Sequence, residues 1–174
     1  MILYFGNIEL LLLKKVYIYL DDNISSAYAK KMKKLLENFV DSISKYKDYT
    51  LLFLNKSNEN ISKKIILLNM DNINIFNSLN IDFNSKNNLN TLLIFLLYKD
   101  QNYSNFFLSN ILDKLIIPEA KYKKEIIDIV NICLDTSKEI YVTPSNITNK
   151  NAVFSNYLIK QGANVILNKY DILK

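Results

Sequence analysis

The side chains that most often carry out enzyme chemistry are scarce in this chain of 174 residues. It contains no histidine, so neither a Ser-His-Asp triad nor a Cys-His pair can form. A zinc site of the usual cysteine and histidine type is also excluded, because Cys133 is the single cysteine. The apolar pattern "EIIDIVNICL" around Cys133 predicts a buried core thiol, and a reactive thiol is the alternative. One cysteine gives no intrachain disulfide, which is typical of a reducing cytoplasm.

The first turn that could bind a ligand is "LDDNISS", residues 20–26, which follows a short apolar segment. It lacks the Gly-x-Gly-x-x-Gly of dinucleotide-binding folds and any Walker A pattern, and Asp21 and Asp22 would repel a phosphate. The composition favours a helix cap, in which these acids and Asn23 or Ser25 stabilise the start of the next helix. The alternative is a metal-binding pair, but adjacent side chains in an extended turn point apart.

A second polar turn, "TPSNITNKN" at residues 143–151, could offer backbone N–H groups to an anion. The alternative is an ordinary crossover loop in which Asn149 or Asn151 caps the following helix. The side chains that would help to bind an anion are Ser145, Asn146, Thr148 and Lys150.

Lysine supplies all 22 basic residues, and the chain has a formal net charge of +5 and a pI of about 9.1. This surplus allows a nucleic-acid partner. Lysines cluster at residues 30–34 ("KKMKK") and 121–124 ("KYKK"). Each cluster is either a solvated helix face or a surface that follows phosphates, with Tyr28, Tyr103 or Tyr122 as platforms on which bases stack.

Short apolar runs alternate with amphipathic segments along the chain, a pattern that predicts an α/β protein. Because the strands are continuous apolar runs, we expect a mainly parallel sheet with helices on both faces, a Rossmann-like three-layer fold. No linker or repeat divides the chain, so we expect a single domain over residues 1–174. The expected strands are residues 15–20, 49–54, 73–77, 90–98, 114–118, 138–143 and 163–167, and the expected helices are 25–43, 60–69, 104–112, 123–135 and 151–161. Residues 77–90 are the expected long loop.

Neither a membrane span nor a secretion signal is expected. The longest apolar runs fall far short of the roughly 18 residues that a spanning helix needs. The N-terminus lacks the basic region and cleavage site of a signal peptide, so we expect a cytoplasmic protein without a membrane partner.

The chain has two glycines, and one of them, Gly162, lies in "YLIKQGANVI". The helix predicted before it and the strand predicted after it indicate a left-handed residue that ends the helix. Since ligands in parallel α/β sheets bind beyond the carboxyl ends of the strands, the turns after the strands are where a site is expected.

Several segments resemble the Rossmann-like domain of the DprA/Smf family of DNA-processing proteins. "KEIYVTPSN", "LIKQGANVIL" and "YDIL" are similar to the family patterns R-E-V-F-A-V-P-G, L-I-x-x-G-A and D-I-L. Upstream, "ILDKLIIPEA" resembles L-S-D-x-V-V-V-V-E-A, and "LYFGNIELL" resembles L-Y-x-K-G-N-L-x-L-L. The segment "NINIFNSLNIDFNSKNNLN" resembles T-I-A-V-L-x-x-G-L-D-x-x-Y-P-x-x-N. The positions that match are Gly6, Leu79, Asp82, Asp113, Glu119, Ala120, Glu139, Pro144, Leu158, Ile159, Gly162, Ala163 and 171–173. The resemblance spans residues 2–173.

The sequence departs from the family at its ligand-binding motifs. The G-S-R after the first strand is replaced by Leu20, Asp21 and Asp22, and of the R-N-R motif Asn105 alone is kept. The family's S-G-S begins at Lys124 here. In the family the arginines of the first two motifs line a basic pocket for single-stranded DNA.

The resemblance implies a non-catalytic protein that binds single-stranded DNA and loads RecA in transformation and recombination. It implies DNA contacts from Lys138, which replaces a family arginine, and from Asn105, Lys124 and Lys150, with no metal and no cofactor. It also implies a homodimer formed through the C-terminal helix and strand, and it implies that the helical domain and the winged helix which often flank this fold are absent.

Two other classes of function remain open from the sequence. One is an interaction protein that keeps the fold but has lost the DNA pocket, which the acids at positions 21 and 22 favour. The other is an enzyme related to nucleotide phosphoribohydrolases, which is not expected because their P-G-G-x-G-T-x-x-E motif is missing.

Overall fold

A computed structural model describes residues 2–21, 26–54, 60–69, 90–96 and 101–173. In this part of the chain, eight strands form one sheet in the order β1-β5-β4-β3-β2-β6-β7-β8. Every pair of neighbours is parallel except β1 and β5. The strands are β1 (Ile2–Gly6), β2 (Lys14–Ile18), β3 (Tyr49–Leu54), β4 (Lys64–Asn69), β5 (Thr91–Leu96), β6 (Lys114–Ile117), β7 (Glu139–Val142) and β8 (Asn164–Val165).

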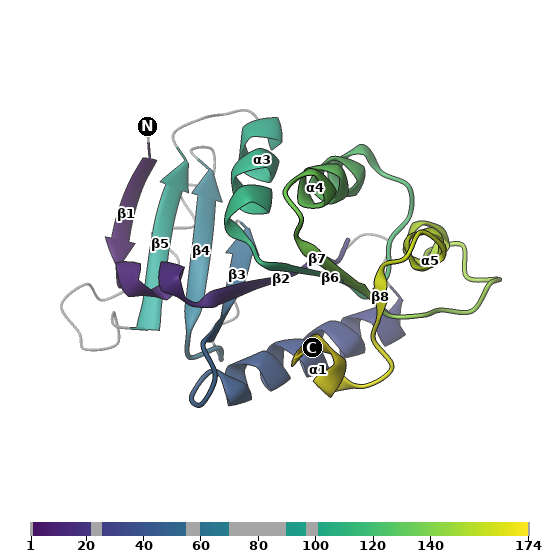
Figure 1. The fold of residues 1–174 in the computed structure, drawn as a ribbon, viewed down its shortest axis with the longest axis horizontal. Coiled ribbons are helices and arrows are strands. Elements are labelled where there is room, and N and C mark those ends of the chain that lie inside the picture. Colours follow the sequence, from purple (N-terminus) through teal and green to yellow (C-terminus); the bar gives the residue numbers. More distant parts are fainter. Residues whose placement is uncertain (1, 22–25, 55–59, 70–89, 97–100, 174) are drawn as a thin grey trace.

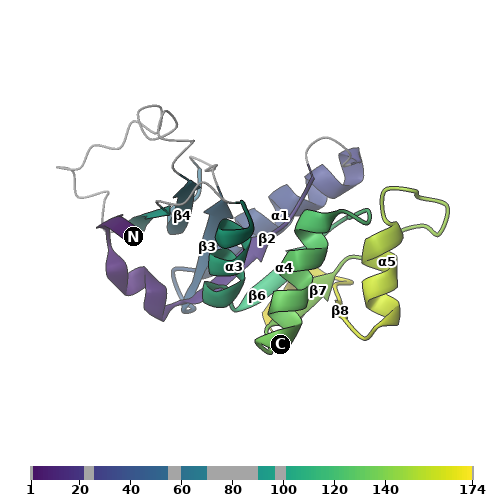
Figure 2. The same cartoon turned by 90° about the horizontal axis from the view of Figure 1, so that it is seen from above.

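Helices cover both faces of the sheet, as Figures 1 and 2 show. On one face lie α1 (Ala27–Ile43) and the C-terminal 3₁₀ helix η4 (Lys169–Leu173). On the other lie α3 (Gln101–Ile111), α4 (Lys124–Asp135) and α5 (Val153–Lys160). A short 3₁₀ helix, η1 (Ile8–Leu12), connects β1 to β2. The predicted three-layer α/β fold with a mainly parallel sheet is confirmed.

The core has two parts, one on each face of the sheet. Alternate residues of each central strand point to opposite faces. Thus Leu52 of β3 packs into the layer of α3 and α4, while Leu51 and Phe53 pack against α1. Cys133 is fully buried in the first layer, and burial raises the pKa of its thiol to about 11. The predicted core thiol is therefore confirmed, because at neutral pH such a thiol stays protonated and shielded from solvent.

The helix predicted over residues 60–69 is wrong. Residues Lys64–Asn69 form β4, which lies between β3 and β5 and has fully buried residues at Ile65, Leu67 and Leu68. A strand covered on both faces shows a continuous apolar run, which short-range periodicity cannot distinguish from a buried helix segment. The strand predicted at 73–77 and the loop at 77–90 lie outside the described residues.

The other predicted elements that lie within the described residues occur where the sequence places them, with ends that differ by a few residues. The edge strand β1 (Ile2–Gly6), which pairs antiparallel with β5, was not predicted. The N-caps predicted from sequence are wrong at two helices. Ser26, rather than Asn23 or Ser25, caps α1, and its Oγ accepts a hydrogen bond from Ala29 N at 3.1 Å. The N-cap of α5 is Ala152, whose side chain makes no capping bond.

Both glycines adopt positive φ. Gly162 has φ +96°, and the bonds from Gly162 N to Ile159 O and from Ala163 N to Leu158 O, both 3.0 Å, form a Schellman motif that ends α5. The predicted helix stop is confirmed. Gly6 ends β1 with φ +101°, beside the carbonyl of Thr91 on β5.

Candidate nucleic-acid interface

The carboxyl ends of β2, β6 and β7 meet at one edge of the sheet, and the loops that follow them are joined by hydrogen bonds. The Thr143 hydroxyl after β7 donates to Pro118 O after β6 at 2.6 Å. Tyr19 N after β2 donates to Ile116 O of β6 at 2.9 Å. These bonds join the described segments that follow the three strands. We call this region the carboxyl edge.

Glu119 is the centre of the polar network at the carboxyl edge. It is 3% exposed, and its carboxylate accepts hydrogen bonds from Ser26 N at 2.7 Å, from Ser26 Oγ at 2.9 Å and from Asn149 Nδ2 at 2.8 Å. Asn149 Nδ2 also donates to Ser145 Oγ at 2.9 Å. The negative charge of Glu119 lies at the N-terminus of α1, where the helix dipole stabilises it. Glu119 thereby ties the start of α1 to the loop after β7.

Asp21 forms an ion pair with Lys123, the residue that precedes α4. The Asp21 side chain is 10% exposed and that of Lys123 is 41% exposed. Asp21, which stands at the second position of the G-S-R motif in the resemblance, is therefore neutralised locally and is partly shielded from a ligand. Ser26 is the N-cap of α1. Asp21 instead connects the segment before α1 to the start of α4 through its ion pair with Lys123. Asp22 lies outside the described residues.

The four residues predicted to contact DNA are not brought together. Lys124 begins α4, Lys150 lies in the loop after β7, and both are exposed at the carboxyl edge. Lys138 precedes β7 and so lies at the opposite, amino edge of the sheet, partly buried. Asn105 lies within α3 and is 3% exposed, so its side chain presents almost no surface to a ligand. Of the four residues, Lys124 and Lys150 are the two that are exposed at the edge where ligands of parallel α/β sheets bind.

Of the three tyrosines considered as stacking platforms, two are exposed. Tyr28 is 53% exposed on α1. Tyr122, 52% exposed, packs against Phe154 and Tyr157 of α5 with ring centroids 4.9 and 5.8 Å away. Tyr103 is partly buried in α3. Tyr122 follows Lys121 in the sequence, and Lys123 on its other side is paired with Asp21.

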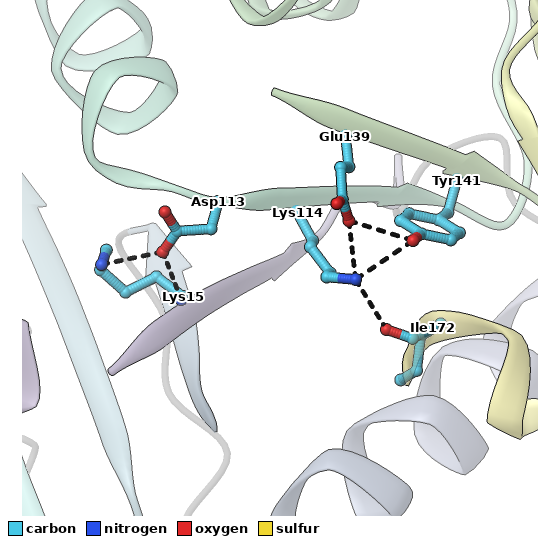
Figure 3. Close-up of polar contacts among 6 residues, drawn as sticks. All are labelled: Lys15, Asp113, Lys114, Glu139, Tyr141 and Ile172. Atoms are coloured by element: carbon cyan, nitrogen blue, oxygen red, sulfur yellow. Dashed lines mark hydrogen bonds and ion pairs between the residues drawn. The ribbon is translucent and has the colours of Figure 1, made fainter. Parts of the chain in front are cut away.

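The amino edge of the sheet carries a second polar cluster (Figure 3). The Lys114 ammonium lies 2.6 Å from Glu139 and donates to the Tyr141 hydroxyl at 3.1 Å and to Ile172 O of η4 at 3.0 Å. Burial alone would lower the pKa of Lys114, but its bonds with Glu139 and Tyr141 outweigh burial and raise that pKa. Lys114 is 2% exposed, and through these bonds the cluster fastens η4 to the sheet.

A second ion pair at the amino edge involves Asp113, one of the positions at which the sequence resembles the DprA/Smf family. Asp113 Oδ2 lies 2.8 Å from Lys15 Nζ and accepts a hydrogen bond from Lys15 N at the same distance (Figure 3). Asp113 thus joins the start of β6 to β2, and Glu139 joins β7 to β6 through Lys114. Both acids have structural roles in the described molecule.

The fold and the carboxyl edge define an α/β protein of the Rossmann-like class, with a lysine-bearing edge where ligands of such sheets bind. Among solved structures it is similar to DNA processing protein A (DprA) from Streptococcus pneumoniae, with a TM-score of 0.73 and 16% identity. This match covers 99% of the chain and 65% of the Streptococcus protein. The chain therefore has the fold of DprA proteins, as the sequence resemblance predicts.

The chain is also similar to DprA from Helicobacter pylori, with a TM-score of 0.72 and 17% identity. This match covers 99% of the chain and 84% of the Helicobacter protein, whose structure concerns a single-stranded DNA binding mode. No protein-family model matches the sequence, and no curated protein matches it. None of the helices in the described ranges is long and apolar enough to cross a membrane.

Proposed function

We propose that this chain is a DprA-like DNA-processing protein that binds single-stranded DNA without catalysing a reaction. The observation that carries the proposal is the similarity of fold to two DprA proteins over 99% of the chain. The net charge of +5 and the exposed lysines at the carboxyl edge agree with a polyanionic ligand. Lysine binds phosphate as a point charge and lacks the two-bond geometry of arginine, so affinity should depend strongly on salt.

Lys124 and Lys150 are expected to contact DNA phosphates at the carboxyl edge. The double variant Lys124→Glu/Lys150→Glu should weaken binding of a labelled oligothymidine by roughly tenfold or more at low salt, because two attractions become repulsions. Fluorescence anisotropy at two salt concentrations measures this. The comparison is Lys138→Glu, which reverses one charge at the amino edge. This variant also tests the DNA contact that the resemblance implies for Lys138.

The outcome separates the two open classes of function. Equal binding by wild type and the double variant would refute the carboxyl edge as the DNA site. Absence of salt-sensitive binding by wild type would favour the alternative, an interaction protein that keeps the fold but has lost the DNA pocket. RecA is proposed as the protein partner from the resemblance, and RecA loading onto DNA should fall in the same double variant.

We also propose a homodimer formed by α5 and β8. Exposed apolar side chains gather on these two elements and the segment after β8: Val153, Tyr157, Val165 and Leu167. β8 is a short edge strand of the sheet, so a second copy could cover it. Tyr157→Glu should shift the protein from dimer to monomer in sedimentation at micromolar concentration, because a charge would be buried in an apolar interface. A monomeric wild type would contradict the proposal.

A further inference from the structure

Helix α1 and the C-terminal helix η4 lie side by side on the face of the sheet opposite α3, α4 and α5 (Figure 1). A groove is lined by residues of both helices. Its volume is about 450 Å³. Lys31, Lys34 and Asn38 border it from α1, and Lys169 borders it from η4. None of the described residues that line it is acidic. We call it the α1–η4 groove.

Aromatic rings lie beside these lysines. Phe39, 7% exposed, forms part of the groove wall, and its ring meets the ring of Tyr170 edge to face at 5.3 Å. Lys169 Nζ lies 5.3 Å from the Phe39 centroid and 5.2 Å from the Tyr170 centroid. These cation–π contacts hold the lysine over the rings. Tyr170 keeps 59% of its surface exposed, so a planar group can still reach it.

Helix α1 connects the carboxyl edge to the α1–η4 groove. Helix α1 begins at Ser26, whose N–H and hydroxyl bind Glu119 at that edge, and the helix then runs along the sheet face toward η4 (Figures 1 and 2). Lys31 and Lys34 lie on the first half of the helix, and Ser42, near its end, also lines the groove. At about 1.5 Å per residue, the stretch from Lys31 to Ser42 extends about 16 Å along the helix axis.

We propose that the α1–η4 groove is a second contact surface for single-stranded nucleic acid, which holds the part of the strand that leaves the carboxyl edge. Lys31, Lys34 and Lys169 bind phosphates, and a base stacks on Tyr170. Asn38 supplies an amide for the base edge. Aromatic rings interspersed with cations are how sequence-tolerant single-strand binders hold bases and backbone together. This inference rests on the proposed function, because it extends the DNA path beyond the carboxyl edge.

The test compares two oligothymidines, of about 6 and about 20 nucleotides, since only the longer one can cover both surfaces. The variant Lys31→Gln/Lys34→Gln should weaken binding of the long oligonucleotide by about five- to twentyfold and leave binding of the short one unchanged. It should also reduce the slope of log K against log salt by about 1.4, as expected for two lost phosphate contacts at about 0.7 each. Tyr170→Ala should weaken the long complex without changing that slope.

The matched control is Lys30→Gln/Lys33→Gln, which removes the same charge from the same helix outside the groove lining. At about 0.15 M salt, where the Debye length is about 8 Å, it should change affinity for either oligonucleotide by less than about twofold, because neither lysine lines the groove and salt screens charges that do not contact the ligand. Thermal unfolding of all variants verifies that the fold is intact.

Equal loss in the two double variants would overturn the inference, because net charge alone would then explain the effect. Competition by oligoglutamate as strong as that by oligothymidine would also overturn it, in favour of an acidic protein segment. If the groove variant leaves the long complex unaffected while Lys124→Glu/Lys150→Glu weakens the short one, the inference fails and the proposed function stands. If wild type binds neither oligonucleotide, both fail.

Discussion

Lys114→Met is expected to lower the free energy of unfolding by about 2–4 kcal/mol at neutral pH. Methionine keeps most of the aliphatic length, but it leaves Ile172 O without its donor and removes the cation bound to Glu139 and Tyr141, which stay hydrogen-bonded to each other at 3.0 Å. The Glu139 side chain is 48% exposed and can be hydrated after the substitution, so the loss stays below that of a fully buried ion pair. Urea unfolding followed by far-ultraviolet circular dichroism measures the change.

The matched control is Lys47→Met, which removes the same charge from an exposed site in the turn before β3. Its effect should remain within about 0.5 kcal/mol. A similar loss in both variants would show that the internal bonds of Lys114 do not matter and that net charge explains the result. Because Lys114 binds η4, its variant should also expose η4 to proteolysis before the rest of the chain unfolds.

The part of this stabilisation that depends on the Glu139 carboxylate should be lost in acid. Burial alone would raise the pKa of Glu139, but its bonds with Lys114 and Tyr141 outweigh burial and lower that pKa below the ordinary value of 4.5. A carboxyl with a lowered folded-state pKa stabilises the protein above its unfolded pKa, and this stabilisation is lost as pH falls through the folded pKa. The gap between wild type and Lys114→Met should therefore narrow below about pH 4.

Gly6→Ala is the other substitution with a large expected effect, about 2–4 kcal/mol. A Cβ at Gly6 would lie 2.1 Å from Thr91 O, a backbone atom that cannot move aside without breaking the pairing of β1 with β5. The positive φ of +101° adds strain for any residue with a side chain. Thermal or urea unfolding measures the loss, and hydrogen exchange of the Leu93 amide, which faces β1, reports whether β1 has separated from the sheet.

Gly162→Ala provides the comparison, since φ is similar at +96° but nothing lies within 4 Å of an added Cβ. It should cost about 1 kcal/mol, the cost of conformational strain alone. If the two alanine variants lose the same free energy of unfolding, the contact with Thr91 O has no effect. The strain of a positive φ would then explain the loss at both glycines.

The sequence by itself determined the fold class and most of the elements. The strand at Tyr49–Leu54 begins and ends as predicted, and α4 differs from its prediction by one residue. The structure of these segments follows from their own periodicity or apolar run, whatever the segments around them are. Gly162 likewise ends α5 through hydrogen bonds to residues close to it in the sequence. β4 was missed because burial on both faces removes the alternation on which prediction of a strand depends.

The candidate site was determined by tertiary structure. Asp21 and Lys123 are 102 positions apart in the sequence, and Ser26 and Glu119 are 93 positions apart. Local sequence patterns do not predict contacts between residues that are so far apart in the chain. The burial of Asn105 follows from the packing of α3 in the core, whereas the place of Lys138 could have been inferred, since a residue before a parallel strand lies at the amino edge. Sequence specifies which segments bury apolar surface, because that depends on local spacing. Which polar side chains meet, and whether a lysine faces solvent or the interior, is decided when the sheet brings distant loops to one edge.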